Sequence, residues 1–142
     1  MSPDEIEIRY CQFVEDVLNH GHLDALPTYM TADVVSHAPG VASGCAGARR
    51  FIETLVSAFR DFHCTIDAVA AADDELVARL TVTGTHSGTL LGLLPTGRRV
   101  RVSAFGAWQL REGQCAEQWL QLDMPGLLQQ LGAELTASSP RR

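Results

Sequence analysis

Apolar residues recur at steps of three and four positions through the first half of the chain, which is the spacing of an amphipathic helix. This pattern predicts a helix over residues 4–19, a short helix over 23–30 and a third helix over 48–59. Between the second and third helices, residues 33–37 have the composition of a brief strand that ends before Pro39. The first half is therefore expected to be mainly helical.

In the second half the pattern changes to alternation of apolar and polar residues, as in half-buried strands. Strands are predicted over residues 65–72, 76–86, 98–110 and 114–123, followed by a closing helix at 125–131. Sequential strands joined by short turns predict an antiparallel meander. The expected fold class is α+β, with the N-terminal helices covering the concave face of a curved, cone-shaped antiparallel sheet. Such a cone leaves a cavity suited to a small apolar ligand.

Length and composition are those of an ordinary globular domain. The chain has 142 residues, of which 46% are hydrophobic and 20% are charged, so a single core suffices. We expect one domain over residues 1–132 and a flexible tail over 133–142, because the tail has nothing to bury. No apolar run approaches the length of about 20 residues that a membrane span needs.

Charge and cysteine content exclude several classes of partner. A formal net charge of -6 argues against nucleic acid, because its phosphates require a basic face. The cysteines are scattered without metal-ligand spacing, and the N-terminal segment lacks the apolar core of a signal peptide. No serine-hydrolase or phosphate-loop motif is present either. We expect a reduced, cytoplasmic protein that binds no metal, no nucleic acid and no membrane.

Some candidate site residues follow from their positions on the predicted strands. His86 continues the apolar face of strand 76–86, where it either contacts a ligand carbonyl or caps the backbone of a loop. Trp108 shares the apolar face of strand 98–110 and is expected to line the pocket or the core. Asp123 precedes the closing helix, which favours a capping role over a catalytic one.

Several stretches of the chain resemble one known family. They are VARLTVTGTHSG, LGLLPTGRRV, the turn REGQ leading into EQW, and LLQQLG towards the end. Taken together they are similar to the motifs of the SnoaL-like polyketide cyclases, within the nuclear transport factor 2-like superfamily. The resemblance implies a cone-shaped α+β barrel and an enzyme of secondary metabolism, such as antibiotic biosynthesis, that uses no cofactor. It also implies a small hydrophobic polyketide-type substrate and a homodimer formed through the outer face of the sheet.

The resemblance also gives roles to particular positions. Members that close rings by aldol chemistry carry a carboxylate directly after the tryptophan of the last strand, and here that position is Leu120, which transfers no proton. By analogy, the side of the strand that carries Leu120 faces the pocket. Gln118 is then expected either to meet the ligand or to bond across strands. In ketosteroid isomerase-like relatives, the position of His37 lies near the general base and Tyr10 matches an oxyanion-donating tyrosine.

Structural roles are favoured for these last two residues, since His37 fits a rim histidine in contact with solvent and Tyr10 fits a core residue. We expect a cyclase that closes a ring by holding the substrate in a reactive conformation. The expected catalytic residues are His37, His86 and Gln118, and the expected substrate-binding residues are Tyr10, Phe59, Trp108, Leu120 and Asp123. Two alternatives stay open. They are a hydroxylase or isomerase that uses His37 as its base, and a non-catalytic binding module.

Overall fold

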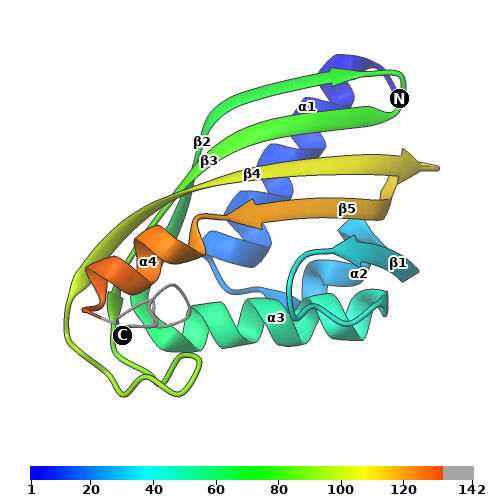
Figure 1. Ribbon diagram of the computed structural model, residues 1–142. Coiled ribbons are helices and arrows are strands. Elements are labelled where there is room, and N and C mark those ends of the chain that lie inside the picture. The colour runs from blue at the N-terminus through cyan, green and yellow to red at the C-terminus, as the bar shows by residue number, and fades with distance from the viewer. Residues whose placement is uncertain (133–142) are drawn as a thin grey trace, which may run out of the picture.

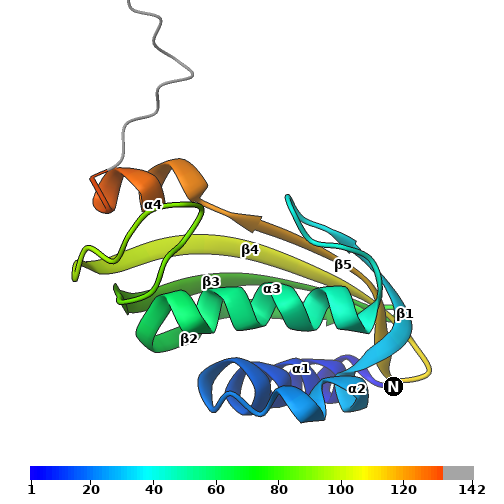
Figure 2. The same cartoon turned by 90° about the horizontal axis from the view of Figure 1, so that it is seen from below.

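The computed structural model describes residues 1–132, and the expected tail at 133–142 lies outside them. Helices lie along the concave side of a bent sheet (Figures 1 and 2). In chain order the elements are α1 (Pro3–Phe13), η1 (Val14–Asn19), η2 (Leu23–Ala25), α2 (Leu26–Tyr29), β1 (Met30–His37), α3 (Gly44–Ala58), β2 (Phe59–Ala72), β3 (Glu75–His86), β4 (Arg99–Arg111), β5 (Gln114–Leu122) and α4 (Met124–Gln130). None of the helices in residues 1–132 has the length and apolarity needed to cross a membrane.

The first helix changes its winding before it ends. Ser2 caps α1, because its hydroxyl accepts a hydrogen bond from the Glu5 backbone nitrogen while the Glu5 carboxylate accepts one from the Ser2 nitrogen. The predicted helix 4–19 then continues as the π-helical segment η1. The Asn19 side chain donates to the Cys64 carbonyl oxygen at 3.0 Å and accepts from the Cys64 backbone nitrogen at 2.7 Å. The end of this helix is therefore fastened to the edge strand β2.

The sheet has five strands in the order β1-β5-β4-β3-β2. The α+β class is confirmed, and β2 to β5 form the predicted antiparallel meander. The expectation of a wholly antiparallel sheet is wrong at one edge, because β1 pairs with β5 in parallel and makes the sheet mixed. No short turn joins these two strands, because they are far apart in the sequence. Local sequence signals therefore do not indicate whether they pair in parallel or antiparallel. The sheet curves round the helices without closing into a barrel (Figure 2).

Strand β2 begins earlier than predicted because α3 passes into it without a turn. The backbone nitrogen of Phe59 donates the last hydrogen bond of the helix, to the Leu55 carbonyl oxygen, and the same residue begins the strand. The pairing of β2 with β3 is irregular between Arg60 and His63, and Asp61 there has a φ of 55°. This bulge hides the alternation, so the sequence pattern indicates only the regular part of the strand.

Two hydrophobic clusters fill the space between the helices and the sheet. The larger joins α1, β1 and α3 to the concave face, and its most buried members include Val17, Val34 and Cys115. The smaller lies near α4 and contains Phe59 and Leu127. Residues of both clusters border the hollow described next.

Candidate functional site

A hollow opens between α3, the segment that follows β1, the end of β5 and α4, and we call it the outer pocket. Its volume is about 450 Å³, which is within the usual range for small-molecule sites. Its wall comes from five parts of the chain, counting the segment after β1. The residues include Phe51 and Leu55 of α3, Leu90 and Leu91 of the loop after β3, Leu120 and Leu122 of β5, and Leu127 of α4.

A smaller hollow of about 80 Å³, the inner cavity, adjoins the outer pocket on the side of α1. Its wall includes aromatic side chains of α1, β2 and β4 together with Gln118 of β5. The two hollows have several lining residues in common, namely Ala38, Phe51, Leu55, Leu120 and Leu122. A ligand in the outer pocket would therefore touch the same side chains that border the inner cavity.

Leu120 and Gln118 lie on one side of β5, as expected for residues two positions apart in a strand. Leu120 lines both hollows, whereas Gln118 lines the inner cavity. The Gln118 side-chain nitrogen donates to the Ser36 hydroxyl oxygen on β1 at 3.0 Å. The Gln118 amide thus bonds across strands and also borders the cavity, and its role towards a ligand stays a prediction.

Tyr10 and Trp108 pack against each other at the inner cavity. Their ring centroids are 4.9 Å apart with the planes nearly perpendicular, and Tyr10 is 3% exposed. Burial raises the pKa of the Tyr10 phenol well above its usual range, so the hydroxyl keeps its proton and can donate a hydrogen bond. Gly106 of β4 leaves room for this hydroxyl, because a β-carbon there would lie 3.2 Å from the phenol oxygen.

His37 lies on the other face of the sheet and lines neither hollow. Its ring stacks on that of Trp119 with centroids 5.1 Å apart, and its Nε2 is 2.6 Å from a carboxylate oxygen of Glu117. Both partners belong to the side of β5 opposite to Leu120. His37 is exposed, which matches a rim or surface histidine, and its catalytic role stays a prediction.

His86 is fully buried but also lines neither hollow. Its Nδ1 accepts a hydrogen bond from the Thr96 backbone nitrogen at 3.2 Å and lies 3.0 Å from the Thr96 hydroxyl oxygen. The backbone of His86 donates to the Arg98 carbonyl oxygen and accepts from the Gly97 nitrogen. These contacts fasten both ends of the loop between β3 and β4, which supports the loop-capping interpretation of His86.

Two further predicted site residues have structural positions. The Phe59 ring packs against His86 in the smaller cluster, with centroids 5.7 Å apart. Asp123 is the N-cap of α4, and its carboxylate accepts from the Gly126 backbone nitrogen at 3.0 Å, which confirms the capping role. Neither residue lines a hollow. Within residues 1–132 there is also no group of three or more His, Cys, Asp or Glu side chains placed to hold a metal ion.

Comparison with known proteins decides the family of this fold and cavity. A family model of SnoaL-like polyketide cyclases matches residues 8–131. The chain belongs to the SnoaL-like polyketide cyclase family. No curated protein matches the chain.

Solved structures similar to this SnoaL-like chain cover almost its full length. TsrD from Streptomyces laurentii is 28% identical, with a TM-score of 0.87 over 94% of this chain and 99% of TsrD. AclR from Streptomyces galilaeus, a candidate hydroxylase, is 26% identical, with a TM-score of 0.83 over 92% and 98% of the two chains. IdmH from Streptomyces antibioticus, a candidate polyketide cyclase, is 25% identical, with a TM-score of 0.79 over 90% and 99%. The likeness therefore spans proteins with different suggested chemistry.

The largest contribution to the SnoaL-like pocket comes from α3, and none of the lining residues of this helix was among the predicted site residues. Five residues of this helix line the outer pocket and share one stripe, namely Gly47, Arg50, Phe51, Thr54 and Leu55. Their spacing of three, one, three and one positions is that of one helix face, so the helical periodicity contained the signal. The polar members of the stripe interrupt the apolar pattern, and for this reason they were not recognised.

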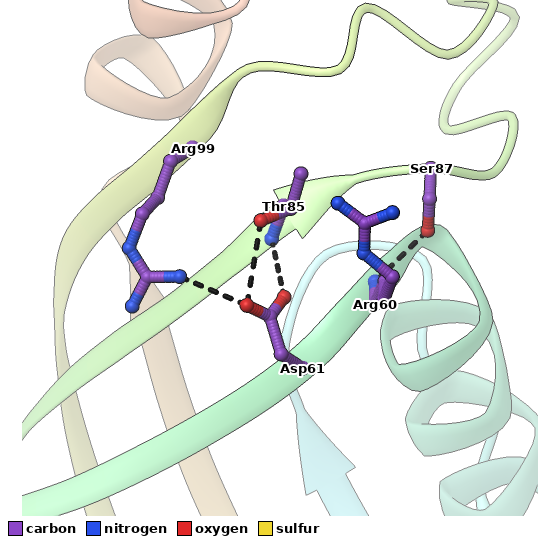
Figure 3. A network of polar contacts seen from close by, with 5 residues as sticks. All are labelled: Arg60, Asp61, Thr85, Ser87 and Arg99. Carbon is purple, nitrogen blue, oxygen red and sulfur yellow. Dashed lines mark hydrogen bonds and ion pairs between the residues drawn. The ribbon is translucent and has the colours of Figure 1, made fainter.

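A polar network fastens the SnoaL-like fold beside the loop that contributes Leu90 to the pocket (Figure 3). The Asp61 carboxylate accepts from the Thr85 backbone nitrogen at 3.0 Å and from the Arg99 guanidinium at 2.9 Å. The Ser87 hydroxyl accepts from the Arg60 backbone nitrogen at 2.9 Å. These bonds replace the regular ladder at the bulge of β2 and hold the start of the loop.

We predict that Asp61→Asn lowers the free energy of unfolding at neutral pH but has a smaller effect in acid. Desolvation raises the pKa of the Asp61 carboxyl, but hydrogen bonds from Thr85 and the charge of Arg99 outweigh it and hold this pKa below its ordinary value. The carboxylate therefore stabilises the fold above the unfolded-state pKa of about 3.9, and the contribution is lost as pH falls through the folded-state pKa. Urea unfolding at about pH 7 and about pH 3 measures the difference. Asparagine tolerates the positive φ, so an equal loss at both pH values would contradict the prediction.

Proposed function

We propose that this chain is a cyclase that closes a ring in a hydrophobic polyketide-type substrate by holding it in a reactive conformation. One observation carries the proposal. Among the described residues that line the two hollows there is no aspartate, glutamate or histidine, and Leu120 occupies the position where aldol-type members carry a carboxylate. With no such group in the wall to move a proton, ring closure by positioning is the chemistry that this wall favours.

Positioning alone can supply a large part of a reaction barrier. Holding two reacting atoms roughly 3–3.5 Å apart in the right orientation can be worth about 7–11 kcal/mol, because the entropy of bringing them together is lost on binding. The outer pocket has the size for a folded substrate of several rings, and its leucine and phenylalanine side chains offer that substrate apolar contact. A pericyclic or conjugate-addition closure suits such a wall better than an aldol closure.

The inner cavity supports the proposal with polar contacts. Its volume of about 80 Å³ accommodates a functional group of the substrate and not a second ring system. Tyr10 offers a protonated hydroxyl there, and Gln118 offers an amide. These two groups would orient a carbonyl or hydroxyl oxygen of the substrate and so fix which of its conformers enters the cavity.

We predict that Gln118→Leu lowers kcat/KM for ring closure about fivefold to tenfold, the loss expected for one hydrogen bond to the substrate. His37→Ala is expected to change it by less than about twofold, because His37 lines neither hollow. Mass spectrometry of the products formed from a linear polyketide precursor measures the rates of both variants and of the wild-type protein.

The opposite outcomes identify the alternatives. Complete loss of turnover in His37→Ala would support a hydroxylase or an isomerase that uses His37 as its base. If the wild-type protein leaves every precursor unchanged while an aromatic ligand raises its melting temperature, the chain is a binding module, since a ligand of the folded state must stabilise that state.

We further propose that the protein forms a homodimer through the outer face of its sheet. Four apolar side chains on this face are exposed, namely Val35 (42%), Val77 (58%), Phe105 (58%) and Trp119 (39%). Several outer-face residues of β2 to β5 also line a shallow, mainly apolar hollow there. A patch of this kind on an open sheet is typical of a protein interface.

We predict that Phe105→Asp converts the dimer to a monomer, because it introduces a charge at the centre of the apolar patch. Size-exclusion chromatography with light scattering measures the mass. Ile8→Asp is the matched control, since Ile8 is similarly exposed, at 57%, but lies on α1. A wild-type monomer, or a Phe105→Asp variant that still dimerises, would contradict this interface.

A further inference from the structure

Arg50 of α3 is the one charged side chain among the described residues that line the outer pocket. We infer that Arg50 binds an anionic oxygen of the substrate, a carboxylate or an enolate, so that the substrate is an apolar molecule with one acidic end. The inference rests on the proposed function, because it names the substrate class of the same pocket.

The charged side chains of α3 are divided between two faces of the helix. Arg49 forms an ion pair with Asp24 at 2.8 Å, and the charge of Glu53 also acts on Arg49. Arg50 belongs to the stripe that lines the pocket, and none of the ion pairs within residues 1–132 includes it. Its guanidinium therefore keeps its hydrogen-bond donors for a ligand.

No other side chain in the described pocket wall carries a positive charge. Thr54, one helical turn after Arg50, uses its hydroxyl proton in a hydrogen bond to the Arg50 carbonyl oxygen at 2.9 Å. The described wall contains no carboxylate that would neutralise the guanidinium. The chain also contains no lysine, so only arginine can present a permanent side-chain cation. A ligand anion in this pocket has Arg50 as its natural partner.

The chemistry of the guanidinium selects the ligand. Its planar fork donates two parallel hydrogen bonds to a carboxylate, and an enolate oxygen accepts one of the same kind. The attraction is stronger beside an apolar wall than in open water, because the effective dielectric constant is lower. The formal net charge of -6 would otherwise disfavour an anionic ligand, so a local cation is needed to accept one.

The position of Arg50 also orients the substrate. Arg50 is exposed although it lines the pocket, so it belongs to the rim, whereas Leu120 borders the inner cavity. An acidic end bound at Arg50 leaves the apolar body to lie against Leu120 and Phe51. The acidic end would therefore remain near solvent while the carbon skeleton is folded inside.

A pair of matched aromatic probes tests the inference. The probes are 2-naphthoate and its neutral analogue 2-naphthamide, with binding measured by isothermal titration calorimetry at low and moderate salt. We expect wild-type protein to bind naphthoate about tenfold more tightly than naphthamide, with the preference reduced by salt. Arg50→Gln should remove this preference and leave naphthamide affinity within about twofold of wild type. Arg60→Gln is the matched control, because Arg60 is also exposed but lines neither hollow.

A third probe distinguishes the two anions. The 1,3-diketone 2-acetyl-1-tetralone ionises to an enolate as pH rises. If its affinity for wild-type protein, but not for Arg50→Gln, increases with its ionisation, the enolate is the preferred anion. If only the affinity for naphthoate depends on Arg50, the carboxylate is the preferred anion. Either result supports an anion site at Arg50.

Failure of this inference is distinguishable from failure of the proposed function. Equal binding of naphthoate and naphthamide to wild-type protein, or a preference for naphthoate that survives Arg50→Gln, overturns the anion site while the apolar pocket stands. If neither probe binds to any variant, the outer pocket does not take aromatic ligands, and the cyclase proposal is overturned with it. Circular dichroism melting curves of the variants establish that each is folded.

Discussion

Leu120→Asp is expected to lower kcat/KM for ring closure about tenfold to a hundredfold, because it replaces apolar contact with the substrate by a group that prefers water. Leu120 lines both hollows, so its side chain lies where the outer pocket meets the inner cavity. An aspartate there would also recreate the arrangement of members that use a carboxylate. The experiment therefore asks whether this pocket works by positioning or lacks a proton-transfer group that would make it faster.

The control for this variant is Leu120→Met, which keeps the volume and the apolar character of the side chain and is expected to retain most of the activity. Rates are measured with the same linear precursor, and melting curves separate a loss of folding from a loss of turnover. A rate that rises in Leu120→Asp would contradict the positioning mechanism and would indicate that proton transfer limits the wild-type reaction.

Gly47→Ala is expected to lower the free energy of unfolding by about 3 kcal/mol. Helix propensity alone predicts the opposite, since alanine is favoured over glycine by about 1 kcal/mol inside a helix. Steric overlap decides the sign of the stability change, because a β-carbon at Gly47 would overlap the carbonyl oxygen and carbon of Ala42. This backbone belongs to the segment that follows β1 and borders the outer pocket.

Ala46→Gly is the matched control for the glycine variant. Ala46 is exposed on the same helix, so this change should cost only the propensity difference of about 1 kcal/mol. Urea denaturation monitored by circular dichroism gives both values. A Gly47→Ala protein as stable as wild type would mean that α3 and the segment before it can move apart at little cost, and the pocket would then be adaptable.

Alternation along the strands was the most informative part of the sequence. It predicted the meander, and it predicted that Leu120 and Gln118 share one side of β5, which is the side that faces the hollows. The position of Asp123 before a proline-led turn likewise predicted the cap of α4. These features are local, since each depends on neighbours within a few residues.

Features that depend on distant partners were not predictable in the same way. The parallel pairing of β1 with β5 joins segments about eighty residues apart, such as His37 and Trp119. This pairing carries the His37 ring to the outer face. The side chain of Asn19 likewise bonds to the backbone of Cys64, 45 residues further along the chain. Such contacts are made only once the chain has folded.

The candidate site was predictable from the strands and from α1, but not from α3. Tyr10, Trp108 and Leu120 lie on regular apolar faces, and all three line the inner cavity. His86 lies on such a face too, but the strand reaches beyond the hollow, and its ring is used to hold the loop after β3. Arg50 carried no signal by itself, because an arginine on an amphipathic helix is usually solvated.

The two tryptophans of this chain have their rings on opposite faces of one sheet, that of Trp108 beside the inner cavity and that of Trp119 stacked on His37 at the outer-face hollow. Each indole is thus an optical reporter of a different event. Quenching of Trp108 emission would follow the filling of the chamber, and a spectral change of Trp119 would follow subunit pairing. With either indole replaced by phenylalanine, a single fluorescence titration would resolve one process from the other.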